Sequence, residues 1–187
     1  MGRRIAGYFA PIAILSQEAH NALIAVQDAL DTLKGGYHLK IFDTYRPATA
    51  VADFLDWAKD HTQQEMKNEY YPHIDKKRLF ELGYLAERSS HSRGSTVDLT
   101  ICVLDNPSLD LSFHKELEME TRFDFFDEIS HTMNPNISAR AKENRAFLVD
   151  IMEKQGFINY PKEWWHFTLK DEPFPETYFD FPIGELS

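Results

Sequence analysis

Residues 89–104 read SSHSRGSTVDLTICVL, a polar stretch that runs directly into the clearest strand pattern of the chain. In its second half, Val97, Leu99 and Ile101 alternate with polar residues, among them Asp98. Successive side chains of a strand point to opposite faces, so the apolar set predicts a buried face. The pattern therefore predicts a central strand that carries Asp98 on the face away from the core.

Helical spacing of apolar residues predicts helices on both sides of this strand. The predicted helices are 16–34 with Ser16 as cap, 47–60, 75–85, and 138–157 with Ser138 as cap and Ala146, Val149 and Met152 facing inward. The predicted strands are 37–46, 95–104 and one or two within 157–170, and 105–110 is a predicted turn or hairpin loop. Strands and helices do not alternate as regular βαβ units. This favours an α+β fold, a small, mostly antiparallel sheet with helices packed around it.

Composition limits the class of partner. The chain has 187 residues, which suits one domain, and its 43% hydrophobic and 27% charged residues are ordinary for a globular protein. Its formal net charge of −10 disfavours nucleic acid and anionic lipid surfaces as partners. No stretch approaches 18 uninterrupted apolar residues, so we expect no membrane span.

Two features bear on the compartment. Cys102 is the only cysteine of the sequence, so no intramolecular disulfide can form, which fits a reducing environment. The start, MGRRIAGYFAPIAIL, has an apolar run interrupted by Gly7 and Pro11 and no small-residue cleavage site, which is typical of mature protein. We therefore expect a cytoplasmic protein. An export signal removed from this start, or lying upstream of it, would instead indicate the periplasm.

The polar stretch before the strand suggests a metal site. Imidazole and carboxylate are both good zinc ligands. His91 is separated from Asp98 by a turn containing Gly94, which lets the backbone fold back and bring the imidazole over the strand. One ligand pair is weak evidence on its own, because a hydrogen-bonded pair or two solvated side chains would give the same pattern.

A second stretch, EWWHF at 163–167, strengthens the metal hypothesis. His166 would complete a shell of three protein ligands, which leaves zinc one open position for water. Glu163 has the chemistry of the general base in metal-assisted hydrolysis. On a regular strand these two residues would face opposite sides, so a bend or strand end is needed, and Pro161 favours one. The alternative is that Glu163 and His166 are a surface pair.

Arg46, in DTYRP, follows the predicted strand 37–46 and precedes a predicted helix. A guanidinium at this position could stabilise the oxyanion that forms when water attacks a carbonyl. The alternative is a surface or helix-capping arginine, which is the commoner habit of this residue.

Taken together, these motifs resemble a known family. SSHSRGSTVDLT and EWWHF, with DTYRP, YYPHID, RFDFFDE and the tail DEPFPETYFDFP, closely resemble the D-alanyl-D-alanine dipeptidase family, zinc metallopeptidases of the vancomycin-resistance dipeptidase type. The resemblance runs from about residue 2 to residue 182. The S-x-H-x6-D and E-x-x-H pair is specific to a small clan of cell-wall metallopeptidases, and the flanking runs narrow it to the dipeptidases.

The resemblance implies a role for each candidate residue. His91, Asp98 and His166 would bind one zinc ion per chain. Glu163 would be the general base and then the acid that protonates the leaving amine, and Arg46 would stabilise the transition state.

The resemblance also implies substrate contacts and a fold. Ser89 and Asp124 match family positions near the bound dipeptide. The implied fold is the small α+β fold of the D-Ala-D-Ala metallopeptidases, with zinc in a cleft on the sheet. Family members carry some tens of residues before the GRRIAGY-like segment. The expectation is therefore a single zinc dipeptidase domain over 1–187 that lacks the family's N-terminal segment.

The implied function is zinc-dependent hydrolysis of the D-alanyl-D-alanine dipeptide to two D-alanines, linked to peptidoglycan turnover or glycopeptide resistance. One alternative is a zinc D,D- or L,D-carboxypeptidase that acts on longer peptidoglycan stem peptides. Another is a non-catalytic zinc- or peptidoglycan-binding module, but such a module has no need of Glu163. The sequence leaves the oligomeric state and the physiological role open.

Overall fold

The computed structural model describes residues 3–104 and 114–184, so the predicted turn at 105–110 lies outside the described residues. The elements, in chain order, are α1 (Gln17–Asp31), β1 (Tyr37–Asp43), α2 (Ala48–Lys59), α3 (Lys67–Tyr70), η1 (Lys76–Arg78), η2 (Ser90–Arg93), β2 (Thr96–Leu104), β3 (His114–Glu116), η4 (Glu128–Ser130), α4 (Ala139–Glu153), β4 (Phe157–Asn159) and β5 (His166–Leu169).

The sheet is organised around β2. Within the described residues it has five strands in the order β1-β2-β5-β4, with β3 paired to the far end of β2. All four strand pairings are antiparallel. The α+β fold with a small antiparallel sheet is therefore confirmed, and 157–170 contains two closing strands.

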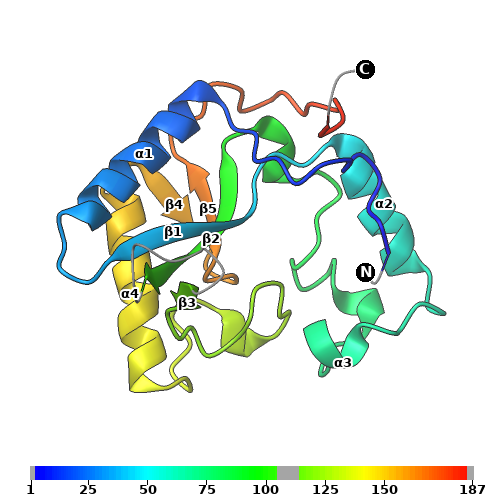
Figure 1. Cartoon of the computed structure of the whole chain (residues 1–187). Helices are drawn as coiled ribbons and strands as arrows, with labels where there is room; N and C mark the ends of the chain where they lie inside the picture. Colours follow the sequence, from blue (N-terminus) through cyan, green and yellow to red (C-terminus); the bar gives the residue numbers. More distant parts are fainter. Residues whose placement is uncertain (1–2, 105–113, 185–187) are drawn as a thin grey trace.

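One face of the sheet carries the main core. Helices α1 and α4 pack against this face, while α2 and α3 lie on the other side of the sheet (Figure 1). Val97, Leu99 and Ile101 are fully buried in this core. The Asp98 side chain points to the opposite face of β2, as the alternation predicts, and so faces the side on which α2 lies.

Ser16 begins α1 and ties it to β2. Its hydroxyl accepts a hydrogen bond from the Ala19 amide at 3.3 Å and lies 2.7 Å from the Ser95 hydroxyl. Leu23 and Val26, on the buried face of α1, then pack into the core. The predicted cap is confirmed, and it fixes the position of the residue that precedes β2.

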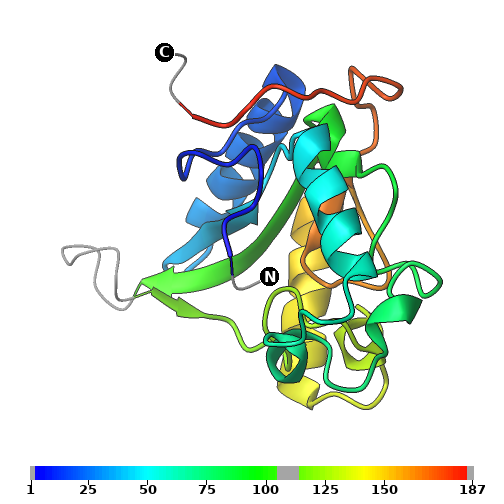
Figure 2. The same ribbon diagram turned by 90° about the vertical axis from the view of Figure 1, so that its right-hand side faces the viewer.

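A second, smaller hydrophobic cluster involves α2, the cyan helix in front of the sheet in Figure 2. It comprises Trp57, Ala58, Tyr71, Leu79 and Tyr84. The predicted helix over 75–85 is shorter than expected: η1 covers only Lys76–Arg78 and is followed by turns. At the start of η1, the buried Lys76 ammonium donates to the Asp60 and Gln63 carbonyls at 2.7 and 2.9 Å and lies over the Trp57 ring.

Helix α4 begins at its predicted cap, Ser138, and its inward face matches the prediction in part, because Met152 is buried and Val149 packs against the core. Ala146 is exposed, and the buried residues are Ala141, Arg145, Leu148, Ile151 and Met152. The buried face was not predicted in full because it includes Arg145, a charged residue that apolar periodicity does not count. Its side chain is 1% exposed and would be costly to bury without hydrogen-bond partners.

The Arg145 guanidinium finds those partners in one loop. It donates to the carbonyls of Met119 at 3.1 Å, His131 at 2.8 Å and Ile129 at 3.0 Å. A single cation therefore holds both ends of the 119–131 segment, which carries Asp124.

The segment after β5 is an irregular arm, as its proline content predicts. The Phe179 amide donates to the Ser92 carbonyl at 2.8 Å, and the Phe179 carbonyl accepts from the Ala48 amide at 3.0 Å. The Asp180 carboxylate accepts from the Thr49 amide at 2.6 Å and so caps α2 from a distance. Of the helices in 3–104 and 114–184, none combines the length and apolarity that crossing a bilayer requires.

We predict that Arg145→Met lowers the free energy of unfolding by about 3 kcal/mol or more, because three buried carbonyls lose their donor. Urea unfolding followed by circular dichroism measures this change. Arg140→Met, at an exposed position of the same helix, is the matched control and should change stability by less than about 0.5 kcal/mol. Equal effects of the two substitutions would contradict the role given to Arg145.

Candidate active site

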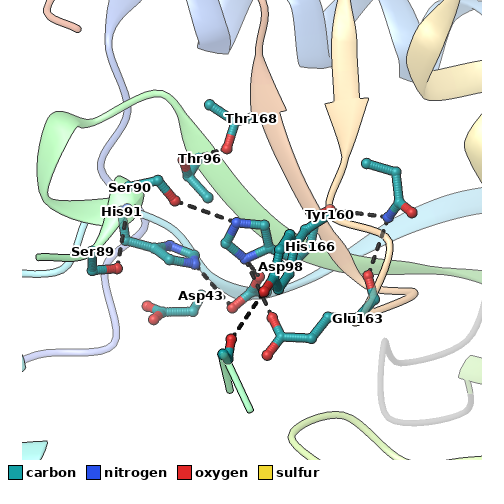
Figure 3. Close-up of polar contacts among 12 residues, drawn as sticks. Asp43, Ser89, Ser90, His91, Thr96, Asp98, Tyr160, Glu163, His166 and Thr168 are labelled. Atoms are coloured by element: carbon teal, nitrogen blue, oxygen red, sulfur yellow. Dashed lines mark hydrogen bonds and ion pairs between the residues drawn. The ribbon is translucent and has the colours of Figure 1, made fainter. Parts of the chain in front are cut away.

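Two histidines and an aspartate from three elements meet on the face of the sheet toward α2. His91 comes from η2, Asp98 from β2 and His166 from the first position of β5. One donor atom from each residue lies within 4.8 Å of the other two. Figure 3 shows both imidazole rings and the carboxylate turned toward one another. The structure thus brings together the three residues that the sequence singles out as ligands.

The backbone explains this convergence. In the β2–β5 pairing, Asp98 lies directly opposite His166. Gly94, with φ of 80°, ends η2 in the left-handed conformation and folds the chain back into β2, which places His91 over the strand.

Polar atoms in this cluster lack partners. His91 Nε2 lies 3.2 Å from Asp98 Oδ2, and His166 Nδ1 lies 3.0 Å from Asp98 Oδ1, but neither contact has hydrogen-bond geometry. Within the described residues, His91 Nε2 and Asp98 Oδ1 are therefore buried without a hydrogen-bond partner. Buried polar atoms are normally satisfied, and a cation between these donors would satisfy them. Two imidazoles and a carboxylate match the donor set of a catalytic zinc site.

In each imidazole ring, the nitrogen that points away from the cluster contacts another group. This contact determines which nitrogen is left to bind a metal. His91 Nδ1 lies 2.5 Å from the Thr44 carbonyl, so it carries the proton and leaves the Nε2 lone pair for a metal. His166 Nε2 lies 3.3 Å from the Ser90 hydroxyl, so Nδ1 is the donor atom directed at the cluster. A backbone carbonyl and a serine thus orient the two rings.

The charges of the cluster favour a cation. Burial alone would raise the pKa of Asp98, but the neighbouring His91 and His166 rings outweigh it and hold that pKa below its usual range. Burial lowers the pKa of His166 by more than Asp98 raises it, so this imidazole is kept neutral. An ionised carboxylate and a neutral imidazole are the forms that bind metal.

Glu163 lies beside the cluster, in the turn that precedes β5. The Glu163 amide donates to the Tyr160 carbonyl at 3.0 Å, and the His166 amide donates to the Glu163 carbonyl at 3.3 Å. This turn supplies the bend that the spacing requires, and it leaves Glu163 Oε2 3.7 Å from His166 Nδ1. Burial, followed by the charges of Asp98 and Asp124, raises the pKa of Glu163 well above its usual range.

Arg46 approaches the cluster from the end of β1. Its Nη2 atom lies 3.8 Å from Asp98 Oδ2, and its side chain is 18% exposed. Asp43 holds this guanidinium, because its Oδ2 accepts from Arg46 Nε at 3.0 Å and from Nη2 at 2.7 Å. The other Asp43 oxygen accepts from the Tyr8 hydroxyl at 2.9 Å.

Sequence reasoning missed three of these contributors: Asp43, Tyr8 and the Thr44 carbonyl. Asp43 carried a usable signal, since it precedes Arg46 by three residues in DTYRP. The other two carried none. Tyr8 lies far from Arg46 in sequence, and a carbonyl has no side-chain signature.

Ser89 and Asp124 lie in different surroundings. The Ser89 hydroxyl accepts from the His91 amide at 3.3 Å and so caps η2. Asp124 adopts a left-handed backbone conformation with φ of 59°, which is uncommon outside glycine and is often found at functional sites. Burial, together with the nearby Asp98 charge, raises the pKa of Asp124 to about 7.

The seven site residues predicted from the sequence all line one cleft of about 340 Å³. They are Arg46, Ser89, His91, Asp98, Asp124, Glu163 and His166. Its apolar walls include Val51, Phe54, Leu55, Phe80 and Phe126. The cleft is of a size that suits a small ligand, and its polar groups converge on the His91–Asp98–His166 cluster.

A three-ligand cluster with a buried glutamate beside it is the arrangement of a metal-dependent hydrolase. Comparison with known families agrees: a family model described as D-ala-D-ala dipeptidase matches residues 1–184. The chain belongs to this family and is a metallopeptidase.

Three relatives, each named D-alanyl-D-alanine dipeptidase, support this membership. The relative from Enterococcus faecium is 41% identical over 97% of this chain and 86% of its own length. That from Enterococcus faecalis is 45% identical over 80% and 70%, respectively. That from Streptomyces coelicolor is 39% identical over 98% and 86%.

We predict a pH-dependent stability that Asp124 causes in the metal-free protein. The pKa of Asp124 is about 7 in the fold and 3.8 ordinarily, so between these pH values the folded chain holds the extra proton. The contribution of Asp124 to stability is therefore fully present below about pH 4 and is lost as the pH rises through about 7.

Thermal melting in chelator across this pH range measures the effect. The wild-type melting temperature should fall more steeply with pH than that of Asp124→Asn, which has no carboxyl to ionise. Because the Asp124 charge also raises the pKa of Glu163, the same pair is compared in the Glu163→Gln background, where the difference between the profiles isolates Asp124. Parallel profiles would refute the prediction.

Proposed function

We propose that this chain is a zinc dipeptidase that hydrolyses D-alanyl-D-alanine to two D-alanines, in peptidoglycan turnover or glycopeptide resistance. The observation that carries the proposal is the meeting of His91, Asp98 and His166 beside the buried Glu163, in a chain whose family relatives are named D-alanyl-D-alanine dipeptidase.

His91, Asp98 and His166 would hold one zinc ion through Nε2, a carboxylate oxygen and Nδ1. When bound, zinc supplies a Lewis acid that lowers the pKa of water at its open position and polarises the substrate carbonyl. The partnerless His91 Nε2 and Asp98 Oδ1 support this assignment.

Glu163 would move the proton. Its carboxylate takes a proton from the attacking water as the water oxygen bonds to the peptide carbon. It returns that proton to the leaving amine as the carbon–nitrogen bond breaks. The surroundings that raise the pKa of Glu163 favour the protonated form, so the side chain is suited to hold the proton between these two steps.

Arg46 would stabilise the negative charge that develops on the carbonyl oxygen. Asp43 fixes the plane of the guanidinium through two hydrogen bonds, and Tyr8 fixes Asp43 in turn. A donor that is already oriented need not reorganise during the reaction.

Asp124 and Ser89 would recognise the two ends of the dipeptide. The carboxylate of Asp124 would pair with the free ammonium. Ser89 Oγ accepts from the His91 amide, which leaves its O–H available to donate to the substrate carboxylate.

We further propose that 1–187 acts as one domain and that it works in the cytoplasm. The first proposal is supported by two residues from opposite ends of the chain that serve one site: His166 lines the cleft, and Tyr8 donates to Asp43, which holds Arg46. The second is supported by the presence of a single cysteine in the sequence, and cell fractionation tests it.

The deciding experiment incubates zinc-loaded protein with D-Ala-D-Ala and measures released D-alanine, with and without chelator. A tripeptide that ends in D-Ala-D-Ala is the comparison. We expect cleavage of the dipeptide alone, lost on chelation. Cleavage of the tripeptide would indicate a carboxypeptidase, and zinc binding without cleavage of either would indicate a binding module.

We predict that Glu163→Gln keeps one zinc per chain but lowers kcat by about 10³-fold, because the neutral amide cannot accept the water proton. Metal analysis and steady-state kinetics measure the two effects. Glu18→Gln, at an exposed position of α1, is the control and should leave both unchanged. Loss of zinc from Glu163→Gln would mean that Glu163 is a ligand and not the base.

We predict that Arg46→Ala retains zinc and lowers kcat by about 10²- to 10³-fold, the usual cost of losing an oxyanion donor. Asp43→Asn should lower kcat by about tenfold, because it loosens the same guanidinium. Since Asp43 acts through Arg46, the double variant should be no slower than Arg46→Ala alone. Additive losses in kcat would show that Asp43 acts independently.

A further inference from the structure

A second cavity of about 320 Å³ adjoins the catalytic cleft. The two hollows share part of their lining, namely Phe54, Leu85, Asp124 and Phe126. Asp124 is the residue of this shared set that carries a charge. The second cavity therefore borders the cleft at the carboxylate proposed to hold the substrate ammonium.

The wall of this cavity is mainly aromatic. Besides the two shared phenylalanines, Phe42, Trp57, Tyr70, Tyr71 and Phe123 line it. Stacking and edge contacts between these rings keep the wall in place: Phe42 stacks on Phe123 at 4.6 Å between centroids, and Trp57 meets Tyr71 edge-on at 5.7 Å. Such a wall suits an apolar or aromatic group.

The other charged residues that line the cavity already have partners. Glu116 forms an ion pair with Lys40 at 2.5 Å, and Arg122 forms one with Glu69. Arg122 also lies over the Tyr70 ring, with its guanidinium carbon 4.6 Å from the centroid. The lining therefore contributes mainly apolar surface to a ligand, with Asp124 at the junction with the cleft.

This geometry assigns an occupant. In a dipeptide the ammonium and the side chain of the first residue leave the same carbon atom. An ammonium on Asp124 and a carbonyl at the His91–Asp98–His166 cluster place that carbon beside the shared wall. We propose that the second cavity is a specificity pocket for the side chain of the substrate's N-terminal residue, and that the enzyme accepts D-dipeptides with a large apolar or aromatic first residue.

This inference rests on the proposed function and extends it. The methyl group of D-alanine would leave most of the 320 Å³ unfilled, whereas a benzyl side chain would reach the aromatic wall. Each additional methylene group buried in an apolar pocket raises the kcat/KM of a substrate over that of its smaller competitor by about tenfold or more. The burial of a large apolar first side chain should therefore offset the cost of accommodating its bulk.

The test compares kcat/KM for D-Phe-D-Ala and D-Ala-D-Ala on the zinc-loaded protein, on Met66→Trp and on Met133→Trp. Met66 lines the cavity, so tryptophan there fills it, whereas Met133 is 84% exposed and outside both hollows. We expect kcat/KM for D-Phe-D-Ala at or above that for D-Ala-D-Ala. It should fall about tenfold or more in Met66→Trp, with D-Ala-D-Ala nearly unchanged. Met133→Trp should alter neither.

Two results would overturn the pocket while leaving the dipeptidase function intact. One is efficient cleavage of D-Ala-D-Ala with D-Phe-D-Ala more than about tenfold worse. The other is a Met66→Trp enzyme that still cleaves D-Phe-D-Ala as well as wild type does. Ile5→Trp, which also fills the cavity, replaces Met66→Trp if that variant does not fold.

A binding measurement separates the pocket from catalysis. Calorimetric titration of the zinc-loaded Glu163→Gln protein should show tighter binding of D-Phe-D-Ala than of D-Ala-D-Ala, and added Met66→Trp should abolish the difference. Equal affinities would contradict the pocket. If wild type cleaves neither dipeptide, the proposed function fails, and this titration still decides whether the cavity binds the aromatic side chain.

Discussion

The carboxylate of Asp98 is buried on the sheet, and the surrounding structure must compensate for the burial of its charge. An isolated buried charge is costly, by several kcal/mol even after relaxation. Here two imidazoles approach its two oxygens and Arg46 lies 3.8 Å from one of them, yet His91 Nε2 and Asp98 Oδ1 still lack hydrogen bonds. The fold therefore concentrates negative potential and unsatisfied donors at one point, which is what a divalent cation requires.

Two residues at the end of β1 orient side chains that surround Asp98. The irregularity between Ile41 and Asp43 in the β1–β2 pairing lets the chain leave the sheet beside Asp98. The Thr44 carbonyl then orients His91, and the Asp43 carboxylate orients Arg46. The proposed metal site and the proposed oxyanion donor are thus anchored to the same few residues, so a shift of this segment would disturb both.

Local patterns predicted the parts of the fold that depend on neighbours in sequence. Alternation gave the correct face for Asp98, and Ser16 and Ser138 are caps where predicted. The failures involve distant partners. Arg145 is buried because carbonyls of another segment satisfy it, and Lys76, in η1, is buried because it reaches the carbonyls that follow α2. The motifs likewise indicated the three residues of the His91–Asp98–His166 cluster, but the supporting contacts of Tyr8 and Thr44 had no sequence signal.

The strand order has a consequence for biosynthesis. β5, near the end of the chain, pairs with β2 and separates it from β4, so the sheet is completed only when β5, which begins with His166, has been synthesised. Such non-local pairing gives a high contact order and slow folding. Until that strand arrives on the ribosome, a nascent chain exposes an unpaired edge of β2, a surface that invites aggregation and chaperone binding.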